Sequence, residues 1–171
     1  SFLFFQPKDI VSGDFYWSGQ KNDRVFFAVV DCTGHGVPGA FMSIVGHDLL
    51  KEAITNLDNP TPATLLDELN KGVCDTLHTT FDDQQVKDGM DVALCCMDYK
   101  TNTIQYAGAY NPLYLVRNGE VIIYDADRFP IGMDRINHNH HFTNNEITLH
   151  ENDTVYAFSD GFEDQFGGKR G

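Results

Sequence analysis

The sequence predicts an α+β fold in which two helices are inserted among many antiparallel strands. Apolar positions in residues 61–81 recur at about 3.6-residue spacing, as in an amphipathic helix. Beyond residue 92, most segments instead alternate with a period of two, which is typical of strands. A second helix follows the first with no strand between them, so a fold of alternating parallel units is excluded. We therefore expect layers of antiparallel sheet and helix.

The first third is predicted to form a β-hairpin. Aromatic and β-branched residues at 15–17 and 25–30 flank a turn-rich segment at 19–23. If the hairpin turns at residues 21–24, its register follows from counting back along both strands. The resulting pairs are Trp17 with Ala28, Phe15 with Val30 and Asp14 with Asp31.

Two helices and six further strands follow. The first helix is expected after Pro38-Gly39, with the apolar stripe Phe41, Val45, Leu49 and Ala53 and with Met42, Leu50 and Ile54 beside it. The second is expected to be capped by Thr61, with Pro62 in its first turn and the stripe Leu65, Leu69, Val73, Leu77 and Phe81. The later strands are predicted at residues 92–98, 103–109, 113–117, 121–124, 142–149 and 154–159. Asn118-Gly119 predicts a tight hairpin turn between two of them.

Composition narrows the possible partners. The chain of 171 residues suits one globular domain. It carries 25 acidic against 12 basic residues, for a net charge of -13. The electrostatic field of such a negative charge repels nucleic acid and anionic lipid, so neither is expected as a direct partner. A divalent cation, in contrast, would relieve the repulsion between clustered carboxylates.

The cysteines and the chain ends indicate the setting. Cys32, Cys74, Cys95 and Cys96 show no C-x-x-C spacing, and the adjacent pair should point to opposite faces of a strand. A reducing, cytoplasmic location is expected. No apolar stretch approaches the roughly 20 residues of a membrane helix. Neither end resembles a natural terminus, so we expect residues 1–171 to be one incomplete domain excised from a longer regulatory protein.

Three carboxylates are expected at the rim of a sheet. Asp31 ends the strand at 25–30, Asp160 follows the strand at 155–158, and the hairpin register sets Asp14 opposite Asp31. Opposed residues have Cβ atoms only about 5 Å apart, where like charges destabilise unless neutralised. A metal ion would neutralise them. The alternative is that these residues only end strands and begin turns.

Other chemistries fit less well. The segment 34–39, GHGVPG, satisfies G-x-G-x-x-G, but a second helix follows where a dinucleotide fold needs a strand. No cysteine is followed by a phosphate-cradling loop ending in arginine, and Ser12 and Ser159 have no evident base. His138, His140 and His141 lack a second ligand pair for zinc. Metal-activated water is the remaining option.

Five motifs resemble the bacterial PP2C-like (PPM) serine/threonine phosphatase domains of the SpoIIE and RsbU type, in the same order. They are VSGDFY at residues 11–16, VDCTGHG at 30–36, GAYNP at 108–112, PIGM at 130–133 and FSDG at 158–161. The resemblance implies a β-sandwich flanked by helices in α-β-β-α layers, truncated here at the C-terminus. It also implies two Mn²⁺ or Mg²⁺ ions at one end of the sandwich.

Residue roles follow from this resemblance. Asp31 would bridge both ions, Asp14 and the backbone carbonyl of Cys32 would complete one site, and Asp160 would bind the other. A hydroxide held between the ions would attack phosphorus in line. The family has a further metal-binding aspartate on a strand near the domain's C-terminus, and this chain stops before such a strand.

Several nearby residues have two readings. His35 is either a proton donor to the leaving seryl oxygen or a structural residue of the glycine-rich turn. Asp88 and Asp91 are expected in a turn, although either could supply a carboxylate to an incomplete site. Asp164 and Gln165 are candidates for hydrogen bonds to metal-bound water.

The predicted activity is metal-dependent hydrolysis of phosphoserine or phosphothreonine on a regulatory partner protein. The resemblance implies a small phosphoprotein substrate of the anti-sigma-factor antagonist kind and an N-terminal sensory domain in the parent protein. An unpaired sheet edge would make dimerisation possible. The alternative is a catalytically inactive, phosphatase-like module that binds or senses a partner or a metal.

Overall fold

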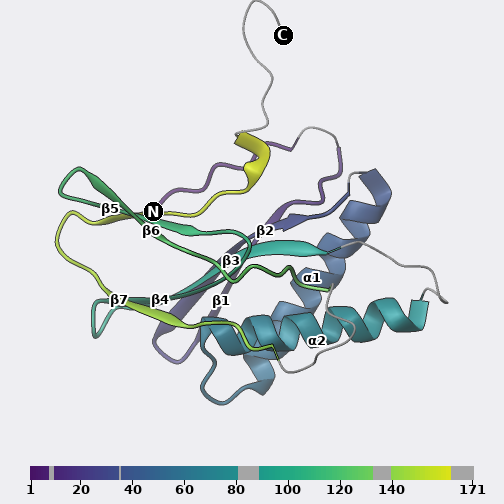
Figure 1. Ribbon diagram of the computed structural model, residues 1–171. Helices are drawn as coiled ribbons and strands as arrows, with labels where there is room; N and C mark the ends of the chain where they lie inside the picture. Colours follow the sequence, from purple (N-terminus) through teal and green to yellow (C-terminus); the bar gives the residue numbers. More distant parts are fainter. Residues whose placement is uncertain (8–9, 35, 81–88, 133–139, 163–171) are drawn as a thin grey trace, which may run out of the picture.

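The computed structural model describes residues 1–7, 10–34, 36–80, 89–132 and 140–162 (Figure 1). Its elements, in order, are β1 Phe15–Lys21, β2 Arg24–Cys32, α1 Gly36–Asn56, α2 Pro62–Thr80, β3 Met90–Asp98, β4 Thr103–Ala109, β5 Leu113–Arg117, β6 Glu120–Tyr124, β7 Asn145–Thr148, β8 Thr154–Tyr156 and the 3-10 turn η1 Asp160–Phe162. Within these ranges no helix is long and apolar enough to cross a membrane.

Two antiparallel sheets form a sandwich. The larger has the strand order β1-β2-β3-β4-β7 and the smaller the order β6-β5-β8. One apolar core fills the space between the sheets, and a second lies between the larger sheet and the helices α1 and α2 (Figure 1). The predicted α+β fold with an antiparallel sandwich is confirmed. In the described residues, both α-helices lie on the outer face of the larger sheet.

The predicted hairpin register is confirmed. Lys21 pairs with Arg24 across the turn, and the ladder continues to Phe15 opposite Val30. Asn22 in the turn has a φ of 55°, a conformation that asparagine tolerates better than most residues. The next pair along both strands would be Asp14 and Asp31.

Strand alternation decides which core each side chain enters. Cys95 is buried between the sheets, whereas Cys96 is buried on the helix side. The prediction that these neighbours point to opposite faces is confirmed. All four cysteines are buried, and none of them forms a disulfide.

The first helix differs from its prediction. It begins at Gly36 instead of after Pro38-Gly39, because proline is tolerated in a first turn whose N–H groups have no helical partner. The predicted stripe is partly wrong, since Phe41 is 60% exposed. The buried residues of α1 are Gly39, Met42, Gly46, Leu50, Ala53 and Ile54. The packed face therefore centres on two glycines that a search for apolar periodicity does not count.

Two late strands are shorter than predicted. β7 omits Phe142, whose N–H donates to Asp67 of α2 at 3.0 Å instead of to a strand. β8 ends at Tyr156, so residues 157–159 lie outside the strand, and η1 begins at Asp160. The predicted Asn118-Gly119 turn is confirmed, with φ values of 53° and 81°.

Lys21 ties the hairpin to the end of α1, and its loss should destabilise the fold. Its Nζ donates at 3.0 Å to the carbonyls of Ile54 and Thr55, and also to that of Leu57. A cation at a helix C-terminus satisfies unpaired carbonyls and complements the helix dipole. We expect Lys21→Met to lower the free energy of unfolding by about 1 kcal/mol in urea denaturation. Lys51→Met, at an exposed position of α1, should have little effect; equal losses would show that only net charge matters.

Candidate metal centre

Two acidic residues, Asp31 and Asp91, are paired across neighbouring strands of the larger sheet. Asp31 lies directly opposite Asp91 in the β2–β3 ladder. Asp31 stands between Val30 and Cys32, and Asp91 stands between Met90 and Val92; all four flanking side chains are buried in the helix-side core. Because side chains alternate along a strand, both aspartates face the second sheet.

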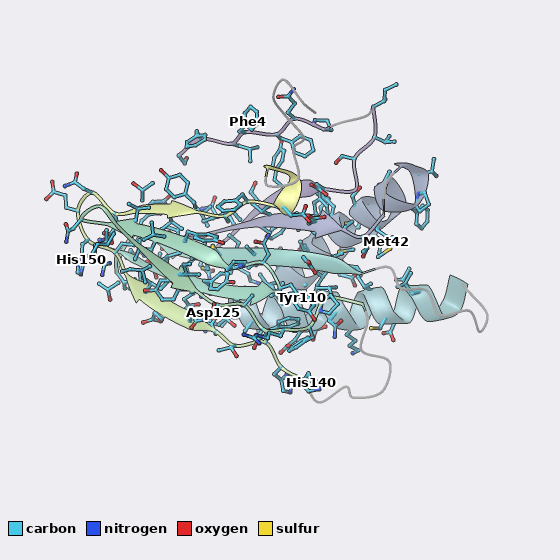
Figure 2. All side chains as sticks on the ribbon, turned by 45° about the horizontal axis from the view of Figure 1, so that its top comes forward. Phe4, Met42, Tyr110, Asp125, His140 and His150 are labelled. Carbon is cyan, nitrogen blue, oxygen red and sulfur yellow. The ribbon has the colours of Figure 1, made fainter. Side chains whose placement is uncertain are left out.

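A segment from the second sheet brings further groups to this edge. β8 leads through Ser159 into η1, which starts at Asp160, and both views place η1 beside the end of β2 (Figures 1 and 2). Ser159 Oγ donates to Asp14 Oδ2 at 3.1 Å. The Asp31 carboxyl interacts with those of Asp14 and Asp160 through side-chain hydrogen bonds. The structure therefore brings together the three acids that the sequence singled out, from three separate segments.

The electrostatics of this cluster are unfavourable in the absence of a cation. Burial, followed by the charges and hydrogen bonds of Asp14 and Asp160, raises the pKa of Asp31 to about 8. Burial and the charge of Asp160 also raise the pKa of Asp91. In the described segments of the chain, no positively charged group contributes to either shift. Crowded carboxylates of this kind hold a shared proton or need a counter-ion.

Close backbone packing positions the Cys32 carbonyl beside the acids. A Cβ added to Gly13 would lie 3.2 Å from the Cys32 oxygen and 3.0 Å from the Gly34 oxygen. A Cβ on Gly39 would lie only 2.6 Å from the Gly34 oxygen. Gly34 itself has a φ of 96°, which strongly favours glycine. The glycines of the GHGVPG segment thus allow the β2–α1 turn to pack against Gly13.

This packing makes Gly39 intolerant of a side chain. We expect Gly39→Ala to lower the free energy of unfolding by about 1–3 kcal/mol, because the clash is with backbone that cannot rotate away. Gly72→Ala in α2 is the matched control: its Cβ would meet Leu49 Cδ2 at 2.6 Å, the end of a flexible side chain. Urea denaturation of both variants measures the difference. A similar stability for the two would contradict the close-packing argument.

The donor set fits a hard divalent cation. Carboxylates and a backbone carbonyl are the oxygen ligands that Mg²⁺ and Mn²⁺ prefer. Among the residues that the structure describes, no three acidic, cysteine or histidine side chains form a ready-made metal cage. The carboxylates contact one another through Asp31 but do not enclose a common point.

Not every candidate residue can be placed. His35, Asp88, Asp164 and Gln165 lie outside the described residues. His141 is exposed and pairs with Asp67 of α2 at 2.9 Å.

Asp91 corrects a prediction. It was expected in a turn but lies in β3, because Thr33 and Gly89 extend the β2–β3 pairing past it: Thr33 N–H donates to the Gly89 carbonyl at 2.9 Å. The buried apolar residues on both sides, Met90 and Val92, were the available signal for a strand.

Comparison with known proteins gives a consistent result. The family model described as stage II sporulation protein E (SpoIIE) matches residues 21–171. The SiaA-PP2C domain of Pseudomonas aeruginosa is similar with a TM-score of 0.84 and 32% identity. That alignment covers 99% of this chain and 64% of the SiaA chain, so this chain spans less than two thirds of that relative's length. No curated protein matches the chain by sequence.

More distant structures share the fold. The PP2C phosphatase domain of SpoIIE from Bacillus subtilis, solved with a fragment of its regulatory domain, has a TM-score of 0.67 at 20% identity, covering 90% of this chain and 41% of that chain. RsbX in complex with magnesium has a TM-score of 0.68 at 13% identity, covering 90% and 69%.

Proposed function

The chain belongs to the SpoIIE family of PP2C-type phosphatase domains, and on this premise we propose that it removes phosphate from phosphoserine or phosphothreonine of a partner protein with the help of Mn²⁺ or Mg²⁺. The observation that carries the proposal is the contact of Asp31 with both Asp14 and Asp160, which joins the hairpin of one sheet to the segment after β8 of the other.

The proposed ligands are the carboxylates of Asp14, Asp31 and Asp160 and the backbone carbonyl of Cys32. When bound, two divalent ions would supply an activated water and neutralise phosphoryl oxygens. Asp31, which contacts both other acids, is suited to serve both ions. Ser159 holds the Asp14 carboxylate in place, because its hydroxyl group donates a hydrogen bond to that carboxylate.

The state of the Cys32 thiol supports a mechanism without a cysteinyl phosphoenzyme. Cys32 is the cysteine beside the acids, and its side chain is only 3% exposed. Burial, together with the charges of Asp14 and Asp31, raises the pKa of its thiol to about 12. At neutral pH the group is therefore a buried thiol, not the thiolate that a cysteine phosphatase requires. This leaves the carbonyl as the functional atom of Cys32.

The substrate is proposed to be a phosphoprotein of the anti-sigma-factor antagonist kind, and this proposal rests on the family alone. A net charge of -13 disfavours nucleic acid as a partner. The rival function, a phosphatase-like module without turnover, shares the same acids and fold.

Turnover separates the two functions. We expect the chain to hydrolyse p-nitrophenyl phosphate and a phosphoserine peptide in Mn²⁺, and to lose this activity when EDTA removes the metal. Rates are compared with a buffer containing Mn²⁺ alone. Measurable Mn²⁺ binding with no hydrolysis of either substrate would favour the binding module. Hydrolysis that persists in EDTA would contradict a metal-dependent mechanism.

A further inference from the structure

A fourth carboxylate, that of Asp91, lies beside the candidate metal ligand Asp31. Asp91 is on β3, the central strand of the larger sheet, and its Cα is the direct ladder partner of Asp31. Both side chains face the second sheet, from which Asp160 arrives. Neighbours opposed in this way have Cβ atoms about 5 Å apart, close enough for two carboxylates to contact one ion.

The backbone fixes Asp91 at this level. On one side, Thr33 Oγ1 donates to the Gly89 carbonyl at 2.6 Å and accepts from the Gly89 N–H at 2.5 Å. On the other, the N–H and carbonyl of Met90 exchange hydrogen bonds of 3.0 and 2.9 Å with Ile131. β3 is thus held between two neighbours immediately before Asp91. A strand pinned this firmly positions its side chain precisely enough to act as a ligand.

Within the described part of the chain, the Asp91 side chain has no partner for a hydrogen bond or an ion pair. It is nevertheless about half buried. Among the residues that the structure describes, the charge that acts on it is that of Asp160, which is repulsive. A partly buried carboxylate facing another acid is costly unless a cation or a proton compensates.

We propose that Asp91 is a fourth acidic residue of the metal centre and supplies an oxygen donor and a negative charge to the ion held on the Asp160 side. This inference rests on the proposed function, because it assumes the metal centre. It adds a residue of the central strand β3 to a centre whose other acids come from β2, from the segment before β1 and from η1.

The test is Mn²⁺ binding by isothermal titration calorimetry, with thermal unfolding as an independent readout. Asp91→Asn keeps the shape of the side chain and removes its charge. We expect at least about tenfold weaker binding at the weaker site, in line with the 10- to 100-fold losses seen on removing groups that support a metal. The rise in Tm produced by Mn²⁺ should shrink accordingly. Asp91→Glu, which keeps the carboxylate, should retain more of the affinity than Asp91→Asn.

Asp58→Asn is the matched control, since it removes the same charge from an exposed loop residue outside the site. It should bind Mn²⁺ as the unsubstituted chain does. Unchanged affinity and stoichiometry in Asp91→Asn, with binding lost in Asp31→Asn, would overturn this inference alone. Failure of the unsubstituted chain to bind Mn²⁺, or equal binding by Asp31→Asn, would overturn the proposed metal centre together with it. If Asp91→Asn unfolds without cooperativity, Asp91→Ser takes its place in the same titration: weaker Mn²⁺ binding supports the role, and affinity equal to that of the unsubstituted chain overturns it.

Discussion

Replacing Asp31 with alanine is expected to reduce Mn²⁺-dependent phosphatase turnover by more than 100-fold. Asp31 contacts both Asp14 and Asp160, and in the proposed metal centre it is the carboxylate that serves both ions, so its removal should weaken both sites. Loss of a residue that merely supports a metal ligand already costs about 10- to 100-fold, and loss of a shared ligand should cost more. The measurement is the initial rate with a phosphoserine peptide over a range of Mn²⁺ concentrations.

The Mn²⁺ series distinguishes two origins of the loss. If Asp31 acts only by holding metal, part of the activity should return at high Mn²⁺ concentration. If Asp31 is also needed to orient the ions, the activity should stay low at every Mn²⁺ concentration. Asp58→Ala, at an exposed position, should keep the rate of the unsubstituted chain. A rate for Asp31→Ala that equals that of Asp58→Ala at every Mn²⁺ concentration would remove Asp31 from the mechanism.

The parts of the site that were predictable are those set by local pairing. The turn at Asn22 and the alternation of the two strands determine the register from Lys21 opposite Arg24 to Phe15 opposite Val30. That register alone brings Asp14 and Asp31 to the same level. A hairpin is a contact between residues near in sequence, so counting along the chain is sufficient.

Contacts between segments that are distant in the sequence were harder to predict. The proximity of Asp160 to Asp31 depends on how the two sheets stack, which no local pattern specifies; its strand-end position and the family resemblance indicated it. Asp91 was assigned to a turn because glycine precedes Met90, and glycine is a common turn residue. The hydrogen bonds between Thr33 and Gly89, which extend the strand instead, join residues 56 positions apart.

The same crowding of acids should make the metal-free protein less stable as pH rises. In the folded state, burial and the neighbouring carboxylates raise the pKa of Asp31 to about 8, against an ordinary value near 4 for an unfolded chain. Between these values the folded state holds a proton that the unfolded state has released. Stability therefore falls as pH increases from about 4 to about 8. The stabilisation that comes from protonating Asp31 is fully present only below about pH 4.

Asp31→Asn cannot titrate, so it should flatten this profile in buffer containing EDTA. At pH 8 we expect the variant to be more stable than the unsubstituted chain by about 1–2 kcal/mol, a figure reduced for solvent screening at a half-buried site. Near pH 4 the two should be similar, because Asp31 is then protonated in the folded protein. Urea denaturation at intervals between pH 4 and 8.5 gives both curves, with Asp58→Asn expected to follow the unsubstituted chain. Parallel curves for Asp31→Asn and the unsubstituted chain would mean that the acids are too far apart, or too well solvated, to repel one another, and the electrostatic argument for a cation at this edge would fail.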